Sequence, residues 1–291
     1  MLQLAAIAAS GALSPAAPDI ASLARRGRAL ALDRGSTSDP KFDSIYTKEG
    51  APRAWANWLI DDRLMLGQYP HCQPAQPGPS AADAEAHLRR VLESSVDCFT
   101  CLQAELPPQD DDAAWPADGG VPLPEAADRA RWPEPFVRYA PAADALASEL
   151  GRAAPPRYLH CPIVDLSVPR DGLAKGASLL HLLDAMLRHY EEGGRAIYVH
   201  CWGGRGRAGL VGACLLSLVR PDLDAERVLQ RVQAGYDSRV GAGAMAAALK
   251  RSPQTEEQRQ FVRAFVRAVR AARRFDGDVA MADGGMPRGF M

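Results

Sequence analysis

A candidate nucleophile and a candidate anion-binding group stand close together in this chain: Cys201 and, six residues later, Arg207. Three glycines lie between them, and they allow successive backbone amides to turn inward around an anion, which side chains would obstruct. Arginine presents a planar fork of N–H donors that grips two oxygens of a tetrahedral phosphate, whereas lysine cannot. These residue types predict phosphate transfer through sulfur.

A strand and a helix are expected on either side of this loop. Residues 195–200 have the composition of a short buried strand, and residues 208–218 are nearly all apolar, as in a buried helix that stops before Pro221. Cys201 then lies near a helix N-terminus, where unpaired N–H groups favour an anion. We expect this environment to lower the thiol pKa from about 8.5 into the range of about 3.5–7.5 found for activated cysteines.

The loop resembles the signature His-Cys-x-x-Gly-x-x-Arg-[Ser/Thr]-Gly of the cysteine-dependent protein tyrosine phosphatases, most closely their dual-specificity branch. Ala208 departs from the pattern, because the family has Ser or Thr at this place. The matching residues are His200, Cys201, Gly204, Arg207 and Gly209.

The resemblance extends over most of residues 55–270. Residues 58–67 resemble the tryptophan-led first strand of the dual-specificity branch, residues 96–102 its next buried strand, and residues 163–169 its general-acid loop. A motif is more specific when its strand–loop–helix context is also present.

The resemblance implies two-step covalent catalysis. Cys201 attacks phosphorus as a thiolate, while the loop amides and Arg207 stabilise the charge on the equatorial oxygens. A carboxylic acid protonates the leaving oxygen and then activates water. Asp165 in the matching loop is the candidate acid, and Asp171, beside a Pro-Arg pair, is its rival. Alternatively, either aspartate caps a helix over roughly 173–190.

The resemblance also implies that the rest of the loop binds phosphate and that His200 supports it. Arg205 adds a cation where a lipid- and inositol-phosphate-directed branch has lysine, which suits a strongly acidic substrate unless Arg205 pairs with a surface carboxylate. Trp202 either walls the pocket against a ring or packs on a neighbouring helix. The phosphate-binding candidates are Trp202, Gly203, Gly204, Arg205, Gly206, Ala208 and Gly209.

Ala208 predicts slow turnover. In the family, the hydroxyl at this place donates a hydrogen bond to the departing thiolate, and alanine cannot. A hydrogen bond to a charged group contributes about 1.5–3 kcal/mol, or roughly ten- to hundredfold in rate. Phosphocysteine is therefore expected to accumulate, unless a water or the loop amides replace the hydroxyl.

An α/β fold follows from these elements, with a central, mostly parallel sheet flanked by helices and the phosphate loop between strand and helix. The chain has 291 residues, 47% of them hydrophobic, which is enough for one catalytic domain with extensions. We expect this domain over 41–275, with a proline-rich and acidic insertion at 107–157. Residues 1–40 are expected to be a disordered or targeting extension, and residues 276–291 a disordered tail.

Other features concern the C-terminal part of the domain. A helix over about 255–273 has one apolar face, and its opposite face is either solvated or contacts anionic lipid headgroups. Gln254 and Gln258 resemble glutamines that touch the site in these phosphatases. The arginines of the opposite face are Arg259, Arg263, Arg267, Arg270 and Arg274.

The composition argues against a nucleic-acid-binding protein and against an integral membrane protein. A formal net charge of −1 gives no attraction to nucleic acid, and the absence of an apolar run of about 18 residues argues against stable membrane insertion. Six irregularly spaced cysteines indicate a reducing compartment, so a cytoplasmic protein is expected. The acid-poor, arginine-bearing residues 1–35 leave a plastid or mitochondrion as the alternative. The lone Cys98-x-x-Cys101 pair is typical of a buried strand, and no metal or cofactor is expected.

Three functions remain open. The first is a phosphatase acting on phosphotyrosine, phosphoserine or phosphothreonine in proteins, with an anionic phospholipid or an inositol phosphate as the alternative substrate. The second is a non-catalytic phosphate-binding pseudophosphatase, for which Ala208 is the sign. The third is a sulfur transferase of the rhodanese type, whose shorter loops lack the Cys-x5-Arg spacing.

Overall fold

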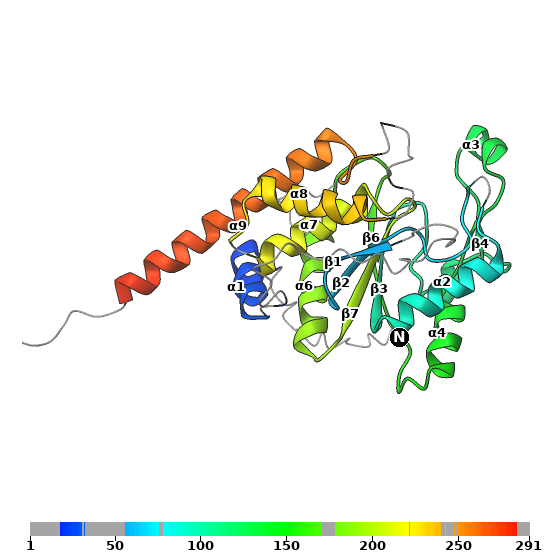
Figure 1. Ribbon diagram of the computed structural model, residues 1–291, viewed down its shortest axis with the longest axis horizontal. Helices are drawn as coiled ribbons and strands as arrows, with labels where there is room; N and C mark the ends of the chain where they lie inside the picture. Colours follow the sequence, from blue (N-terminus) through cyan, green and yellow to red (C-terminus); the bar gives the residue numbers. More distant parts are fainter. Residues whose placement is uncertain are drawn as a thin grey trace, which may run out of the picture.

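The computed structural model describes most of the chain between residues 18 and 283 (Figure 1). For the helical residues 178 and 274–283, it describes the backbone alone. The described residues are 18–30, 32, 56–75, 78–169, 178–220, 222–239, 242, 247 and 250–283.

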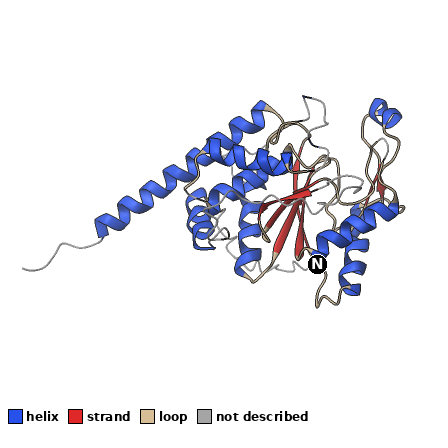
Figure 2. Ribbon diagram, in the orientation of Figure 1, coloured by secondary structure: helices blue, strands red, loops and turns tan. Residues whose placement is uncertain are grey.

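A five-stranded sheet forms the centre of the molecule, with helices on both of its faces (Figure 2). The strand order is β1-β2-β7-β3-β6, in which β1 runs antiparallel to β2 and the other neighbours are parallel. This arrangement confirms the expected α/β fold with a mostly parallel sheet. The strands are β1 (Ala56–Ile60), β2 (Leu64–Gly67), β3 (Val96–Gln103), β6 (Arg157–Ile163) and β7 (Ala196–His200).

The helices cover the two faces unequally. On one face, α7 packs against the sheet and is itself covered by α1, α8 and α9, while α6 packs beside β6 (Figure 1). Every residue of α7 is buried, as its continuous apolar sequence requires. On the other face, α2 packs against β3 and α4. These helices are α1 (Ile20–Leu30), α2 (Ala81–Glu93), α4 (Ala140–Glu149), α6 (Ser178–Glu191), α7 (Arg207–Val219), α8 (Ala225–Asp237) and α9 (Glu256–Asp283).

The segment expected as one tryptophan-led strand over 58–67 is instead a hairpin of β1 and β2. The chain reverses at Asp61 and Asp62, and Arg63 N–H donates to the Ile60 carbonyl at 3.0 Å. Asp62 has a φ of +57°, a conformation that aspartate tolerates better than most residues. The charged residues Asp61, Asp62 and Arg63 interrupt the apolar run at this turn, a signal that the resemblance to a single strand did not use.

Both chain extensions are more structured than expected. Residues 1–40 were expected to be disordered or a targeting extension, but within them α1 folds onto the core and buries Leu23 and Ala24. The helix approaches α7 closely at Gly27, where an added Cβ would lie 2.7 Å from the Leu218 carbonyl oxygen. The predicted tail at 276–291 is helical as far as Asp283, because α9 meets no proline there and the next residues are Gly284 and Gly285.

Residues 107–157, the expected insertion, fold into small elements. A two-stranded antiparallel ribbon joins β4 to β5, and large apolar side chains from this segment, among them Trp115, Phe136 and Leu146, are buried on the α2 face. The remaining elements are a 3-10 turn at Asp112–Ala114, β4 (Gly120–Val121), α3 (Ala126–Arg131) and β5 (Phe136–Val137).

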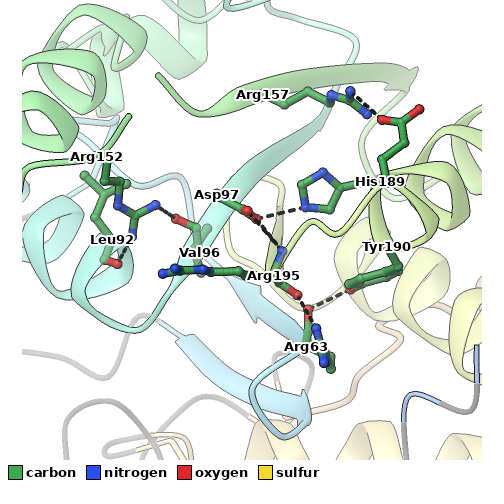
Figure 3. Close-up of polar contacts among 10 residues, drawn as sticks. Arg63, Leu92, Val96, Asp97, Arg152, Arg157, His189, Tyr190 and Arg195 are labelled. Carbon is green, nitrogen blue, oxygen red and sulfur yellow. Dashed lines mark hydrogen bonds and ion pairs between the residues drawn. The ribbon is translucent and has the colours of Figure 1, made fainter. Parts of the chain in front are cut away.

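A polar cluster closes the amino-terminal edge of the sheet (Figure 3). The Asp97 carboxylate accepts from His189 Nε2 at 2.8 Å and from the Arg195 backbone N–H at 3.0 Å, which ties β3 to α6 and β7. Arg152 donates to the carbonyls of Val96 and Leu92 and so holds the start of β3 to the end of α2. Burial raises the pKa of Asp97. The hydrogen bonds from His189 and from the Arg195 backbone N–H outweigh burial, so the pKa of Asp97 is lowered overall.

The lowered pKa of Asp97 predicts a contribution to stability that depends on pH. We expect Asp97→Asn to lower the free energy of unfolding near pH 7 by about 1–3 kcal/mol, the range for losing hydrogen bonds to a charged group. A carboxyl with a depressed folded-state pKa stabilises above its unfolded pKa and loses this effect as pH falls through the folded value. Urea unfolding should therefore show the difference from wild type shrinking below the ordinary pKa of 3.8.

The exposed turn variant Asp62→Asn is the matched control and should stay within about 0.5 kcal/mol of wild type. A difference for Asp97→Asn that is constant from pH 3 to pH 7 would contradict the role of the carboxylate.

Candidate active site

The phosphate loop connects the end of β7 to the start of α7, as the sequence predicts. Cys201 follows β7 directly and is 3% exposed, and the loop ends at Gly206, the residue before α7. Gly204 has a φ of +68°, and an added Cβ would lie 2.2 Å from the carbonyl carbon of Gly67. Both conditions require glycine, because the end of β2 presses against the loop.

Arg207 is fixed by a carboxylate that sequence reasoning missed. Its Nη1 and Nη2 donate to the two oxygens of Glu105 at 2.8 and 3.0 Å, and Nη1 also donates to the Ile163 carbonyl at 3.0 Å. Burial alone lowers the pKa of Arg207, but the charges of Cys201 and Glu105 more than offset it and raise the pKa above its ordinary value. The guanidinium is therefore a permanent cation beside the thiol.

One donor of Arg207 remains for a ligand. Its Nε is buried and has no hydrogen-bond partner among the described residues. A buried N–H without a partner is rare in native proteins, and it suits a site that binds an oxyanion. The N-terminus of α7 provides further unpaired amides at the same place.

Asp165, the candidate acid, lies beside Arg207. Its Oδ1 lies 3.0 Å from Arg207 Nη2, and its side chain is 52% exposed, at the open side of the site. Its loop is tied down at both ends, because Ile163 O accepts from Arg207 and Ser167 O accepts from Gln258 Nε2 at 2.9 Å. The rival Asp171 lies outside the described residues.

Arg205 points along the loop and makes no ion pair within the described part of the chain. Its Nε donates to Gln254 Oε1 at 3.1 Å, and its guanidinium lies 3.5–3.9 Å from the place of a Cβ on Gly203. The alternative in which Arg205 pairs with a surface carboxylate is therefore not the one observed. Gln254 and Gln258 both lie at the site, as their resemblance to family glutamines suggested.

Trp202 braces the loop against segment 107–157, not against a helix. Its Nε1 donates to the Pro74 carbonyl at 2.9 Å, and its ring meets Phe136 and Trp132 edge-on at centroid distances of 5.6 Å. The ring is half-buried. Of the two alternatives, packing is the one that these contacts support.

His200 supports the loop from the buried side. Its Nε2 lies 2.8 Å from Tyr139 Oη, and both residues are buried. Burial lowers the pKa of His200 far below its ordinary value, with His160 and Arg207 adding to the effect, so the imidazole is neutral. Tyr139 belongs to segment 107–157, and no sequence pattern connects it to the loop.

A second buried arginine holds the back of the loop. Arg239 is 4% exposed, and its Nη2 donates to the carbonyls of Gly204 and Leu66, both at 2.9 Å. Its Nε donates to Asn57 Oδ1 at 2.7 Å. Burial lowers the pKa of Arg239 to about 10, so the side chain stays charged at neutral pH. Like Tyr139, this residue was missed, because nothing near Arg239 in sequence marks it.

No group of three or more metal-ligating His, Cys, Asp or Glu side chains occurs within the described ranges. None of the helices that the structure describes is long and apolar enough to cross a membrane.

The free Nε–H of Arg207 predicts a specific oxyanion site. Inorganic phosphate should bind the wild-type protein. Arg207→Lys should raise the dissociation constant for phosphate at least about tenfold, because lysine lacks the planar fork. Isothermal titration with phosphate measures both constants. Arg157→Lys, on an exposed arginine paired with Glu192, is the control and should bind phosphate like wild type. Equal phosphate affinity in all three proteins would contradict this site.

Comparisons with known proteins find a family model that matches part of this chain. Residues 150–262 match the family described as PTP-SAK: Swiss Army Knife protein, DSP-PTPase phosphatase domain. No curated protein matches the chain.

Several solved structures are similar at low identity. Tk-PTP in its active form is 20% identical, with a TM-score of 0.40, 73% of this chain covered and 96% of that chain. PTPMT1 is 18% identical, with a TM-score of 0.42 and coverages of 76% and 99%. Kinase associated phosphatase with its catalytic cysteine replaced by serine is 16% identical, with a TM-score of 0.43 and coverages of 72% and 88%.

The matched residues 150–262 contain the Cys201–Arg207 loop, the acid loop around Asp165 and the two glutamines. Over these residues the chain is similar to the DSP-PTPase phosphatase domain that this family describes.

Proposed function

We propose that this protein hydrolyses phosphate monoesters of phosphorylated proteins through a phosphocysteine intermediate. One observation carries the proposal: beside Cys201, the buried Arg207 is held by Glu105 through both Nη atoms, and its Nε–H remains for phosphate. The site therefore combines a nucleophile, a fixed cation and unpaired helix amides.

In the proposed reaction, Cys201 Sγ attacks phosphorus and the ester bond to the leaving oxygen breaks. The Nε–H of Arg207 and the loop amides stabilise the charge on the equatorial oxygens. Asp165 donates a proton to the leaving oxygen, then accepts one from the water that cleaves the S–P bond. Its position at the open side, near Arg207, supports this role.

A phosphoinositide or inositol phosphate is the second candidate substrate, and Arg205 favours it. This cation lies within the loop, and its contact is to a neutral amide, so its charge remains for an additional acidic group. A panel of phosphotyrosine, phosphothreonine and phosphoserine peptides with soluble phosphoinositides and inositol phosphates separates the two substrates by phosphate release.

The acid role of Asp165 predicts a leaving-group effect. Cys201→Ser should abolish phosphate release from every substrate. Asp165→Asn should lower kcat by about 10²–10⁴ on phenyl phosphate, whose leaving oxygen needs a proton, and far less on para-nitrophenyl phosphate. Steady-state kinetics on both esters measures the difference.

Asp110→Asn, on an exposed loop, is the matched control and should behave like wild type. If Asp165→Asn slowed both esters equally, another group, with Asp171 first in line, would be the acid. Activity in Cys201→Ser would refute the thiolate mechanism.

Ala208 predicts that hydrolysis of phosphocysteine limits the rate. Ala208 is buried at the first turn of α7, and its methyl group donates no hydrogen bond to sulfur. We expect Ala208→Thr to raise steady-state turnover by roughly ten- to hundredfold and to remove the initial burst seen by stopped flow. Ala208→Val has nearly the same shape without the hydroxyl and should keep the burst. Equal turnover in the Thr and Val variants would count against this account, and absence of any turnover in wild type would favour the non-catalytic alternative.

A further inference from the structure

A buried arginine behind the phosphate loop lacks a counter-charge. Arg239 is 4% exposed, yet it makes no ion pair within the described part of the chain. Its hydrogen-bond partners are all neutral: the Asn57 side chain and the carbonyls of Leu66 and Gly204. Its Nη1 is buried and has no partner among the described residues. A charge this deeply buried is normally paired, so Arg239 is fully stabilised only when a negative group comes near.

The other buried cation of the site differs in this respect. Arg207 is bound through both Nη atoms by the Glu105 carboxylate, so its charge is balanced. Burial lowers the pKa of Arg239, and the negative charges of two tyrosines and of Cys201 act against this effect. Of these groups, Cys201 lies in the loop itself, where the reacting sulfur and a bound phosphate bring negative charge. The loop is therefore the place from which Arg239 receives its counter-charge.

Arg239 also fixes the direction of one loop amide. A peptide group is planar and trans, so its C=O and its N–H point to opposite sides. The Gly204 carbonyl accepts from Arg239 Nη2 at 2.9 Å. The N–H of the same peptide group belongs to Arg205, and it therefore points away from Arg239. A charged donor on the carbonyl also polarises the peptide group, which makes its N–H a stronger donor.

Two neighbouring peptide groups of the loop are held in the same way. The Trp202 carbonyl accepts from the Tyr69 N–H at 3.1 Å, and the Arg205 carbonyl accepts from Ser252 Oγ at 2.9 Å. In each case a donor outside the loop takes the carbonyl and turns the N–H of the following residue away from itself. Of these three outside donors, only Arg239 is charged. The amides turned in this way are those of Gly203, Arg205 and Gly206.

We propose that Arg239 is a positioning residue of the phosphate loop: it turns the Arg205 N–H toward the bound oxyanion, and that oxyanion balances its buried charge. The proposal rests on the proposed function, which identifies the oxyanion as a phosphate group. An arginine that served only the fold would affect stability alone. A positioning residue also sets how strongly the loop prefers an anionic ligand to a neutral one.

Alkylation of Cys201 by iodoacetate and by iodoacetamide tests the proposal. Both reagents form an S–C bond with loss of iodide, and they differ in carrying a carboxylate or a neutral amide. The measured quantity is the ratio of the two second-order rate constants at Cys201, followed by mass spectrometry at one pH, so that the fraction of thiolate cancels. Wild type should prefer iodoacetate. Arg239→Gln should lower the ratio about tenfold, the effect of losing one charge-assisted hydrogen bond. Arg239→Lys keeps the charge and should lower the ratio by no more than about threefold.

Arg152→Gln is the matched control. Arg152 also donates to two backbone carbonyls, those of Val96 and Leu92, but at the amino-terminal edge of the sheet. Its removal should leave the ratio at Cys201 unchanged. Cys214 reports unfolding in every variant, because this buried thiol reacts only when the core opens.

An unchanged ratio in Arg239→Gln with Cys214 protected overturns this inference, as does an equal fall in the Gln and Lys variants. Rapid labelling of Cys214 in Arg239→Gln also overturns it, because the arginine then serves the fold alone. Alkylation needs no phosphate release, so the two proposals fail separately. A wild type that prefers iodoacetate but hydrolyses no phosphate ester overturns the proposed function alone, whereas one that releases phosphate without preferring iodoacetate overturns this inference alone.

Discussion

The ion pair between Arg207 and Glu105 is the interaction on which the candidate site depends. Removing one partner of a buried pair costs about 3–5 kcal/mol, because an uncompensated charge remains in the interior. Glu105 takes both Nη atoms of Arg207 and leaves Nε for a ligand. The pair that stabilises the buried cation thus also decides which N–H of Arg207 remains without a partner among the described residues. It joins the residues after β3 to the start of α7, at the carboxyl edge of the sheet.

Segments far apart in sequence hold the backbone of the loop around this pair. Tyr139 contacts His200, the rings of segment 107–157 pack on Trp202, and Arg239 binds the Gly204 carbonyl. Amides fixed in this way before a ligand arrives need no reorganisation when charge develops on it. The open side differs, because Asp165 is 52% exposed where Cys201 is 3% exposed. A rigid floor and an exposed acid loop suit a site that holds phosphate tightly and meets the rest of its substrate at the rim.

Most of the central elements were predictable because their signals are local. The apolar runs of β7 and α7, and the glycines between them, specify strand, loop and helix without reference to the rest of the chain. The hairpin of β1 and β2 was missed although three charged residues, Asp61, Asp62 and Arg63, interrupt the apolar run, because the segment resembles a single first strand. The helix α1 was missed because an alanine- and arginine-rich segment also suits a disordered or targeting extension, and its close contact with α7 at Gly27 depends on the tertiary fold.

The sequence by itself predicted the candidate nucleophile, the glycine-rich loop and its arginine, because Cys201 and Arg207 belong to one short segment with the spacing of the resembled signature. It also indicated Asp165 as the candidate acid, because residues 163–169 resemble the general-acid loop of the family. Only the tertiary structure decided which groups hold that arginine and that loop. Glu105, Tyr139 and Arg239 come from separate elements, and the strand order that sets β3 beside β7 brings Glu105 to Arg207. Such pairings depend on which elements become neighbours in space, and no local pattern of residues records that.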